Sequence, residues 1–191
     1  MIDLLDKWDT NLFLFFNKLH HPVVDPVMIF LSDNYIAMVI LLISLLFWIY
    51  KELCSFKKFS IFFAILLIIF GLSDSITSRI FKPGFERLRP CHNPQISSQV
   101  YTAHKKCWGG KFGFVSSHSS NSFAVILFFI LALRRRYRYI WGLLIYSGLV
   151  AYSRIYLGKH YPGDILVGAL IGSSLAYMGY RLVTLKYLLK S

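Results

Sequence analysis

A twelve-residue stretch, SRIYLGKHYPGD (153–164), places an arginine, a histidine and an aspartate between two apolar runs. Pro162 suits the first turn of a helix, where its missing N–H group costs nothing, and Asp164 then lies where its carboxylate can reach back. Asp164 could accept a hydrogen bond from one ring nitrogen of His160 and leave the other nitrogen unprotonated for nucleophilic attack. The alternative interpretation is that Asp164 only caps the helix that follows.

Groups that suit an anion also lie at the ends of other apolar runs. They come from KPGFERLRP, GFVSSHSSN and the stretch above, and are Lys82, Arg89, Ser116, Ser117, His118 and Arg154. Helix N-termini offer free N–H groups and partial positive charge, and arginine and lysine complement phosphate oxygens, so together these residues predict a phosphate site. His118 could protonate a departing oxygen. Each residue also has a structural interpretation when it is considered alone. His118 could simply be the neighbour of a helix cap, and Lys82 and Arg89 could be anchors in the membrane interface.

The composition is that of a membrane protein. Of the 191 residues, 56% are hydrophobic and 16% are charged, which leaves too little polar surface for a soluble domain. A spanning helix needs about 20 mainly apolar residues, so five or six spans fit in a single domain over residues 1–191. The net charge of +12 comes from short basic clusters between apolar runs, so we expect the lipid bilayer and not nucleic acid as the partner.

The apolar pattern predicts an all-α fold, an integral membrane bundle of five spans with one N-terminal amphipathic helix, six helices in total. Residues 4–19 alternate apolar and polar positions at helical spacing, so we expect a helix within residues 1–22 that lies in the membrane interface. It could equally pack against the spans. The predicted spans are residues 27–50, 59–81, 115–133, 139–152 and 165–185. The fourth is short, so it borrows residues from its flanks or lies where the bilayer thins.

Five spans place alternate connections on opposite sides of the membrane. One side carries ten basic residues against a single acid, Glu52; the ten are Lys51, Lys57, Lys58, Arg134, Arg135, Arg136, Arg138, Arg181, Lys186 and Lys190. The other side carries the amphipathic helix, a long loop over residues 82–113 and the 153–164 stretch. The positive-inside rule predicts that the basic side, with the C-terminus, is cytoplasmic. The site would then face the periplasm or exterior of a bacterial inner membrane.

The long loop contains two cysteines. Cys91 and Cys107 would lie in an oxidising compartment, which favours a disulfide between them. A zinc site formed by Cys91, His92, His104 and Cys107 is the alternative, although adjacent ligands at positions 91 and 92 fit a tetrahedron poorly.

The motifs resemble those of the type 2 phosphatidic acid phosphatase superfamily, which are K-x6-RP, PSGH and SR-x5-H-x3-D. KPGFERLRP and SRIYLGKHYPGD match at every fixed position, whereas VSSH (115–118) replaces the proline and the glycine of the second motif. The resemblance covers residues 70–175. It implies that His160 is a nucleophile that forms a phosphohistidine, that Asp164 supports it, and that His118 releases the alcohol. It also implies phosphate binding by Lys82, Arg89, Ser117 and Arg154, without a metal or another cofactor.

The resemblance predicts an integral membrane phosphatase that hydrolyses a lipid phosphate monoester or diphosphate. The substrates that it implies are undecaprenyl diphosphate, the phosphates of lipid A, and phosphatidylglycerol phosphate or phosphatidic acid. We expect the first two ahead of the others, because a site that faces outward meets those lipids. No protein partner is predicted. A channel or transport subunit that gathers anions is the non-enzymatic alternative, but it would need ionisable residues through the depth of the spans.

Overall fold

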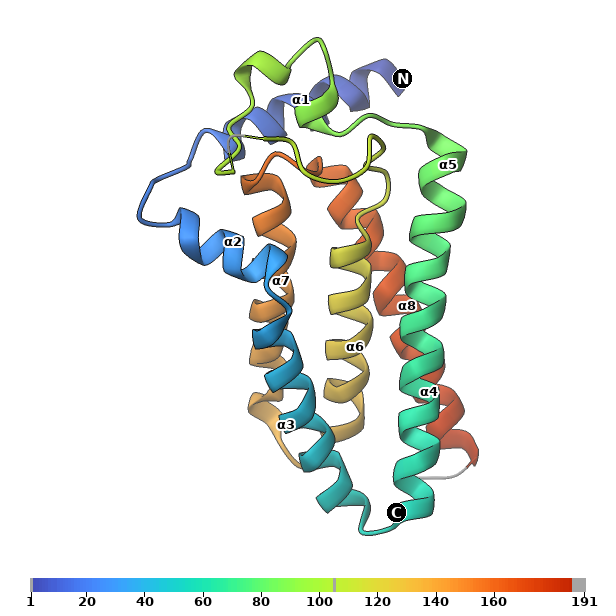
Figure 1. Cartoon of the computed structure of the whole chain (residues 1–191). Coiled ribbons are helices and arrows are strands. Elements are labelled where there is room, and N and C mark those ends of the chain that lie inside the picture. Colours follow the sequence, from blue (N-terminus) through green and yellow to red (C-terminus); the bar gives the residue numbers. More distant parts are fainter. Residues whose placement is uncertain (1, 105, 187–191) are drawn as a thin grey trace.

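The protein is a bundle of helices that run between two ends of the molecule (Figure 1). The computed structural model describes residues 2–104 and 106–186; Met1, Lys105 and residues 187–191, including Lys190 of the predicted basic tail, lie outside the described residues. The helices are α1 (Ile2–Asn17), α2 (Asp25–Asp33), α3 (Tyr35–Leu53), α4 (Phe56–Ser75), α5 (Lys82–Phe85), α6 (Ser117–Leu133), α7 (Leu143–Tyr156) and α8 (Pro162–Lys186). The all-helical prediction is confirmed, because the described residues contain one isolated β-bridge, Leu88 with Phe112, and no strand.

Helix α1 lies across one end of the bundle (Figure 1). It is amphipathic, as predicted: Phe13 is buried against α7 and α8, whereas Leu5 and Trp8 are exposed. The buried Asn17 ends the helix, and its amide donates to the carbonyls of Tyr101 and Tyr156 while its Oδ1 accepts from the Tyr101 N–H. These bonds attach α1 both to the long loop and to the end of α7.

The first predicted span, residues 27–50, is not one continuous helix. It is divided at Asn34 into α2 and α3, and the angle between α2 and the Met38–Leu53 part of α3 is 57°. Asn34 has an extended backbone, and its Oδ1 accepts from the N–H of Ile36 at 2.9 Å as the N-cap of α3. Ser32, Asp33 and Asn34 all have short polar side chains that compete with helical hydrogen bonding, which explains the break.

The second predicted span, residues 59–81, is α4 continued by a π-helical segment, η1 (Ile76–Phe81), and then by α5. In a regular α-helix, residues five apart lie about 140° apart around the axis. Here Thr77 and Lys82 both contact the Ser117 hydroxyl, at 2.9 and 3.1 Å. The wider π turn therefore directs two side chains at α6 that a regular helix would separate.

Helices α6 and α8 pack closely at the centre of the bundle (Figure 1). Gly168 and Gly172 of α8 lie against the backbone carbonyls of Ser116 and Ser120, with Ala176 one turn further along. Small residues spaced by four allow helix backbones to approach closely within a membrane. This approach brings the N-terminal ends of α6 and α8 together, and the Ser116 N–H donates to the Asp164 carbonyl at 3.1 Å.

Within the described residues, two helical stretches are long and apolar enough to cross a membrane, Phe56–Phe85 and Pro162–Val183. The bent pair Asp25–Asp33 and Met38–Leu53 is a third candidate, and α6 is apolar but shorter. Helix α7 has 14 residues and follows a 3-10 turn, η4 (Arg138–Gly142). The prediction of an integral membrane helical protein is confirmed, whereas length and composition alone support two or three of the five predicted spans.

Candidate active site

The candidate nucleophile, His160, lies in the turn between α7 and α8. Gly158 has a φ of 70°, a left-handed conformation that glycine adopts readily, and this turn reverses the chain before His160. The imidazole is buried, and its Nδ1 lies 3.4 Å from Oδ2 of Asp164. That separation is an ion-pair distance and longer than a good hydrogen bond. The same Oδ2 accepts from the N–H of Tyr161 at 2.9 Å, so Asp164 fixes the turn as well as facing the ring.

Three of the predicted phosphate-binding cations act electrostatically on His160. Burial lowers the pKa of His160 well below its usual value, and the positive charges of Arg154, Arg89 and Lys82 lower it further, against the opposing effect of the Gly113 carbonyl. The ring is therefore neutral at neutral pH, which is the form a nucleophile requires.

Arg87 is a member of the site whose role the motifs do not indicate. Its guanidinium donates to Asp164 Oδ1 at 2.9 Å and to Asp9 Oδ2 at 2.8 Å, with Asp6 Oδ1 at 2.7 Å, and it lies over the Tyr161 ring at 3.9 Å. Burial alone would lower the pKa of Arg87, but the three carboxylates raise it, so it remains a cation. In the sequence, Arg87 could have been noticed as a second basic residue two positions before Arg89. Its role could not be predicted, because the acids that it binds are distant in the sequence.

Arg154 extends toward the end of α2 and binds residues that sequence analysis did not single out. Its Nη1 contacts the Ser32 hydroxyl and lies 3.4 Å from Asp33 Oδ1. Lys159 Nζ binds both oxygens of Asp33, at 2.7 and 3.0 Å, and His104 Nε2 lies 2.8 Å from Oδ2. The sequence feature that could have indicated these contacts is the polar triplet at positions 32–34 within an apolar run, because polar residues inside a span are often functional.

The start of α6 presents the serines and His118. Ser116 is the N-cap of α6; its hydroxyl accepts from the N–H of Ser119 at 3.4 Å and is fully buried. Ser117 accepts from Lys82 Nζ, which brings the first two motifs into contact. His118 is half-buried and faces a cavity of about 210 Å³. Ser116 therefore stabilises the N-terminus of α6, whereas Ser117 and His118 lie at the site.

The long loop carries Arg89 into the site. Its two ends pair, with the Arg89 N–H donating to the Lys111 carbonyl and the Gly113 N–H to the Arg87 carbonyl. The Arg89 guanidinium donates to the carbonyls of Phe112 and Trp108 at 3.3 and 3.4 Å. These contacts fix a buried arginine that is exposed on only 7% of its surface.

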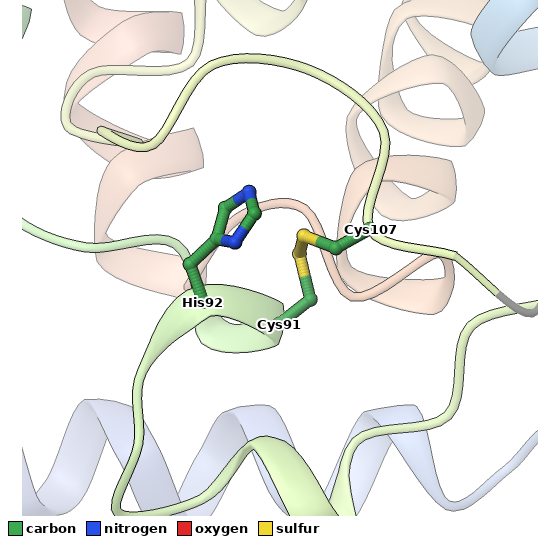
Figure 2. A group of neighbouring side chains, drawn as sticks. All are labelled: Cys91, His92 and Cys107. Carbon is green, nitrogen blue, oxygen red and sulfur yellow. A yellow bond between two sulfur atoms is a disulfide. The ribbon is translucent and has the colours of Figure 1, made fainter.

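The loop also contains a disulfide between Cys91 and Cys107, with the His92 ring beside it (Figure 2). The three side chains form the one group in the described residues whose spacing could hold a metal ion. Zinc is bound by free thiolates, however, and these two sulfurs are bonded to each other. His104, the fourth ligand of the zinc alternative, instead contacts Asp33. The Cys91 N–H donates to the Gly158 carbonyl, so the disulfide end of the loop is attached to the turn that precedes His160.

A buried neutral histidine beside an aspartate, in the field of fixed cations at one end of a membrane-embedded helical bundle, can attack a phosphorus atom, and the cations can stabilise the charge that develops on it. The fold and the site thus define a membrane-bound phosphatase.

Comparison with known proteins agrees with this class. The family model of the PAP2 superfamily matches residues 57–187. Two relatives named lipid A 4'-phosphatase are each 34% identical: that of Porphyromonas gingivalis over 91% of this chain and 72% of the relative, and that of Bacteroides thetaiotaomicron over 94% and 79%. Undecaprenyl-diphosphatase BcrC of Bacillus subtilis is 27% identical over 85% of this chain and 76% of its own. A crystal structure of a PAP2-type phosphatidylglycerolphosphate phosphatase from Bacillus subtilis shares the fold, with a TM-score of 0.69 at 18% identity over 94% of this chain and 86% of that one. The chain belongs to the PAP2 superfamily.

Proposed function

We propose that this phosphatase acts on a lipid phosphate through a phosphohistidine intermediate. Because Nδ1 of His160 faces Asp164, Nε2 is the nitrogen that attacks phosphorus. The bond from phosphorus to the leaving oxygen breaks as the P–N bond forms, and His118 gives its proton to that oxygen. Water then attacks the phosphohistidine, His118 takes a proton from the water, and inorganic phosphate leaves. The observation that carries this proposal is the buried His160–Asp164 pair among fixed cations.

In this scheme Lys82, Arg89 and Arg154 hold the phosphate oxygens, and Ser117 contributes at the start of α6. Their positive charges stabilise the five-coordinate phosphorus as a metal clamp does in other enzymes. Arg154 would exchange its contacts with Ser32 and Asp33 for contacts with the substrate. Ser116 supports the N-terminus of α6 rather than binding phosphate, because its hydroxyl is fully buried as a cap.

Lipid A phosphate is the substrate that the comparisons favour. Both relatives at 34% identity carry the name lipid A 4'-phosphatase and align with more than nine-tenths of this chain, whereas the undecaprenyl-diphosphatase relative is less similar. Undecaprenyl diphosphate is the second candidate, followed by phosphatidylglycerol phosphate and phosphatidic acid. Phosphate release from a panel of these lipids with one purified preparation ranks them. The proposal for lipid A is wrong if phosphatidic acid is hydrolysed far faster.

We further propose one domain of five spans in a bacterial inner membrane, with the site outside the cytoplasm. The bent α2–α3 pair, α4 to α5, α6, η4 with α7, and α8 would be the spans. Helix α6 can be short because other helices surround it instead of lipid. Helix α1 would lie in the interface above the spans and the 82–113 loop would cover the site, while Lys51 and the Arg134–Arg138 loop at the opposite end would face the cytoplasm. If a cysteine placed in that loop were labelled from outside intact cells, the orientation would be the reverse of the one proposed.

Replacement of the nucleophile tests the chemistry. His160→Ala should abolish phosphate release while the protein remains folded in detergent, and a phosphorylated intermediate trapped by acid quench should be absent. His20→Ala is the matched control, because His20 lies after α1 and outside the site, with its exposed ring stacked on Tyr101; this variant should leave both readouts unchanged. If His160→Ala retained near-normal turnover, the phosphohistidine mechanism would be wrong.

A further inference from the structure

The cavity beside His118 indicates what the leaving group must be. In the proposed reaction His118 protonates the departing oxygen, so the leaving group lies against His118, in the cavity of about 210 Å³ that it lines. Its lining combines apolar side chains, such as Leu31, Phe70 and Val150, with a polar group formed by Asp74 of α4 and Ser117, Asn121 and Ser122 of α6. Among the described residues that line this cavity, Asp74 is the one carboxylate and none is a lysine or an arginine.

The polar wall is built by hydrogen bonds between α4 and α6. Asn121 Nδ2 donates to Asp74 Oδ1 at 3.2 Å, and Asn121 Oδ1 accepts from the Ser73 hydroxyl at 2.6 Å. The Ser73 and Ser120 hydroxyls lie 2.7 Å apart and are buried. A carboxylate offers about four acceptor positions, and Asn121 uses one at Asp74. The network thus holds the Asp74 carboxylate at the cavity wall and leaves acceptor positions on it for hydroxyl donors.

The same cavity continues into an apolar groove of about 340 Å³ between α3, α4 and α6. Five residues line both spaces and form the neck between them, namely Met38, Phe70, Asn121, Ser122 and Tyr146. Beyond the neck the lining is aliphatic and aromatic, including Leu42 and Phe63. A molecule that extends from His118 along this path therefore passes first through partly polar and then through hydrocarbon surroundings.

We propose that Asp74 and Asn121 form a leaving-group subsite that selects an uncharged, hydroxyl-bearing group carrying a hydrocarbon chain. This inference rests on the proposed lipid phosphatase activity and assigns the preference within it. The hydroxyls of a sugar would donate to Asp74, and an acyl chain would enter the groove. The leaving group of a diphosphate is itself a phosphate, and its charge would be repelled by the Asp74 carboxylate. The enzyme would thus prefer a sugar-linked phosphate monoester to a diphosphate.

The test compares two substrates with three proteins. Phosphate release from lipid A and from undecaprenyl diphosphate is measured with wild type, Asp74→Asn and Asn121→Asp, and kcat/KM values are compared as a ratio. Asp74→Asn removes the repelling charge, so the ratio should shift about tenfold toward the diphosphate, a change of ~1.4 kcal/mol. Asn121→Asp places a second carboxylate against Asp74; the two share a proton near neutral pH, so the added charge, and with it a shift of the ratio toward lipid A, should appear as the pH rises. Glu86→Gln is the control, because Glu86 is exposed in the long loop and outside both cavities, so it changes the net charge equally without touching the subsite.

The outcomes separate this inference from the activity that it assumes. If wild type hydrolyses both lipids and neither Asp74→Asn nor Asn121→Asp moves the ratio more than Glu86→Gln does, the subsite assignment is wrong and the phosphatase proposal stands. If wild type releases phosphate from neither lipid, both proposals fail. If Asp74→Asn does not fold, as judged by its elution as a single species in detergent, a shift by Asn121→Asp toward lipid A as the pH rises supports the subsite. A ratio in Asn121→Asp that stays unchanged as the pH rises would then overturn it.

Discussion

Arg87 should be a positioning residue whose loss uncouples the catalytic pair. The side chain of Asp164 is fully buried, and Arg87 is the cation that binds it, at 2.9 Å. Removing one partner of a buried ion pair costs about 3–5 kcal/mol, because the remaining charge is left uncompensated. The contact with Asp6 adds little, since that carboxylate is 62% exposed and exposed pairs contribute about 0–1 kcal/mol. Arg87→Met should therefore lower the free energy of unfolding by about 3 kcal/mol.

The catalytic effect follows from the same contacts. An unpaired Asp164 would move or take up a proton, and a misplacement of about 1 Å at a reacting group can reduce the rate about 100-fold. We expect kcat of Arg87→Met to fall by that factor with little change in KM, because Lys82, Arg89 and Arg154 still hold the phosphate. Arg87→Lys should be intermediate, since it keeps the charge but not the fork. Lys106→Met, which removes an exposed cation of the same loop, is the control. Wild-type kcat and a wild-type unfolding midpoint in Arg87→Met would refute the reasoning.

Three further predictions concern the packing, the titration and the loop. Gly172→Ala places a methyl group against the Ser120 carbonyl and should destabilise the protein by about 1–3 kcal/mol, seen as a lower unfolding midpoint in detergent, whereas Gly148→Ala has open space around it and should not. The pKa of His160 is lowered in the folded protein, so the acid limb of kcat/KM should lie below the usual histidine range. For the same reason the unfolded state alone takes up this proton, so stability should fall as the pH drops through ~6.5, and His160→Asn should remove the share of that dependence that comes from this residue. The Cys91–Cys107 disulfide closes a separation of 16 residues and should contribute about 3 kcal/mol; the double serine variant should unfold earlier, and Cys54→Ser, at the free exposed cysteine, should not. Unchanged unfolding of the double variant would contradict this estimate.

The helices were predictable because their pattern is local. Apolar runs and amphipathic spacing located α1, α4, α6 and α8 to within a few residues, and Ser117, His118 and Asp164 lie in the first turns of α6 and α8. The break at Asn34 was not predicted, because the flanking residues are apolar enough to continue a span and the cause is competition from three short polar side chains. The π turn before Lys82 was also missed, since its reason is the pair of contacts with Ser117 on another helix.

The site was predictable in its residue types more than in its contacts. Spacing alone suggested that Asp164 faces His160, and the structure brings them to 3.4 Å. The partners of Arg87 and Arg154 could not be predicted, because Asp9 and Asp33 come from helices far away in the sequence and no local pattern links them. For Ser116 the residue type was misleading: its hydroxyl suits phosphate binding, but it caps the N-terminus of its own helix instead.

The contacts of α1 with the start of α8 can form only late in the assembly of the bundle. Asp9 Oδ1 accepts from the N–H of Gly163 at 2.7 Å, across 154 positions of the chain, and Arg87 joins the same two regions to the loop. In the proposed topology α1 would reach the membrane surface before α8 inserts, because α1 is synthesised first. The surroundings of His160 are complete only after α8 inserts. A chain arrested before α8 would therefore lack the contacts of Asp9 with Gly163 and of Arg87 with Asp164, so we expect activity only after α8 has been made and has packed against α1.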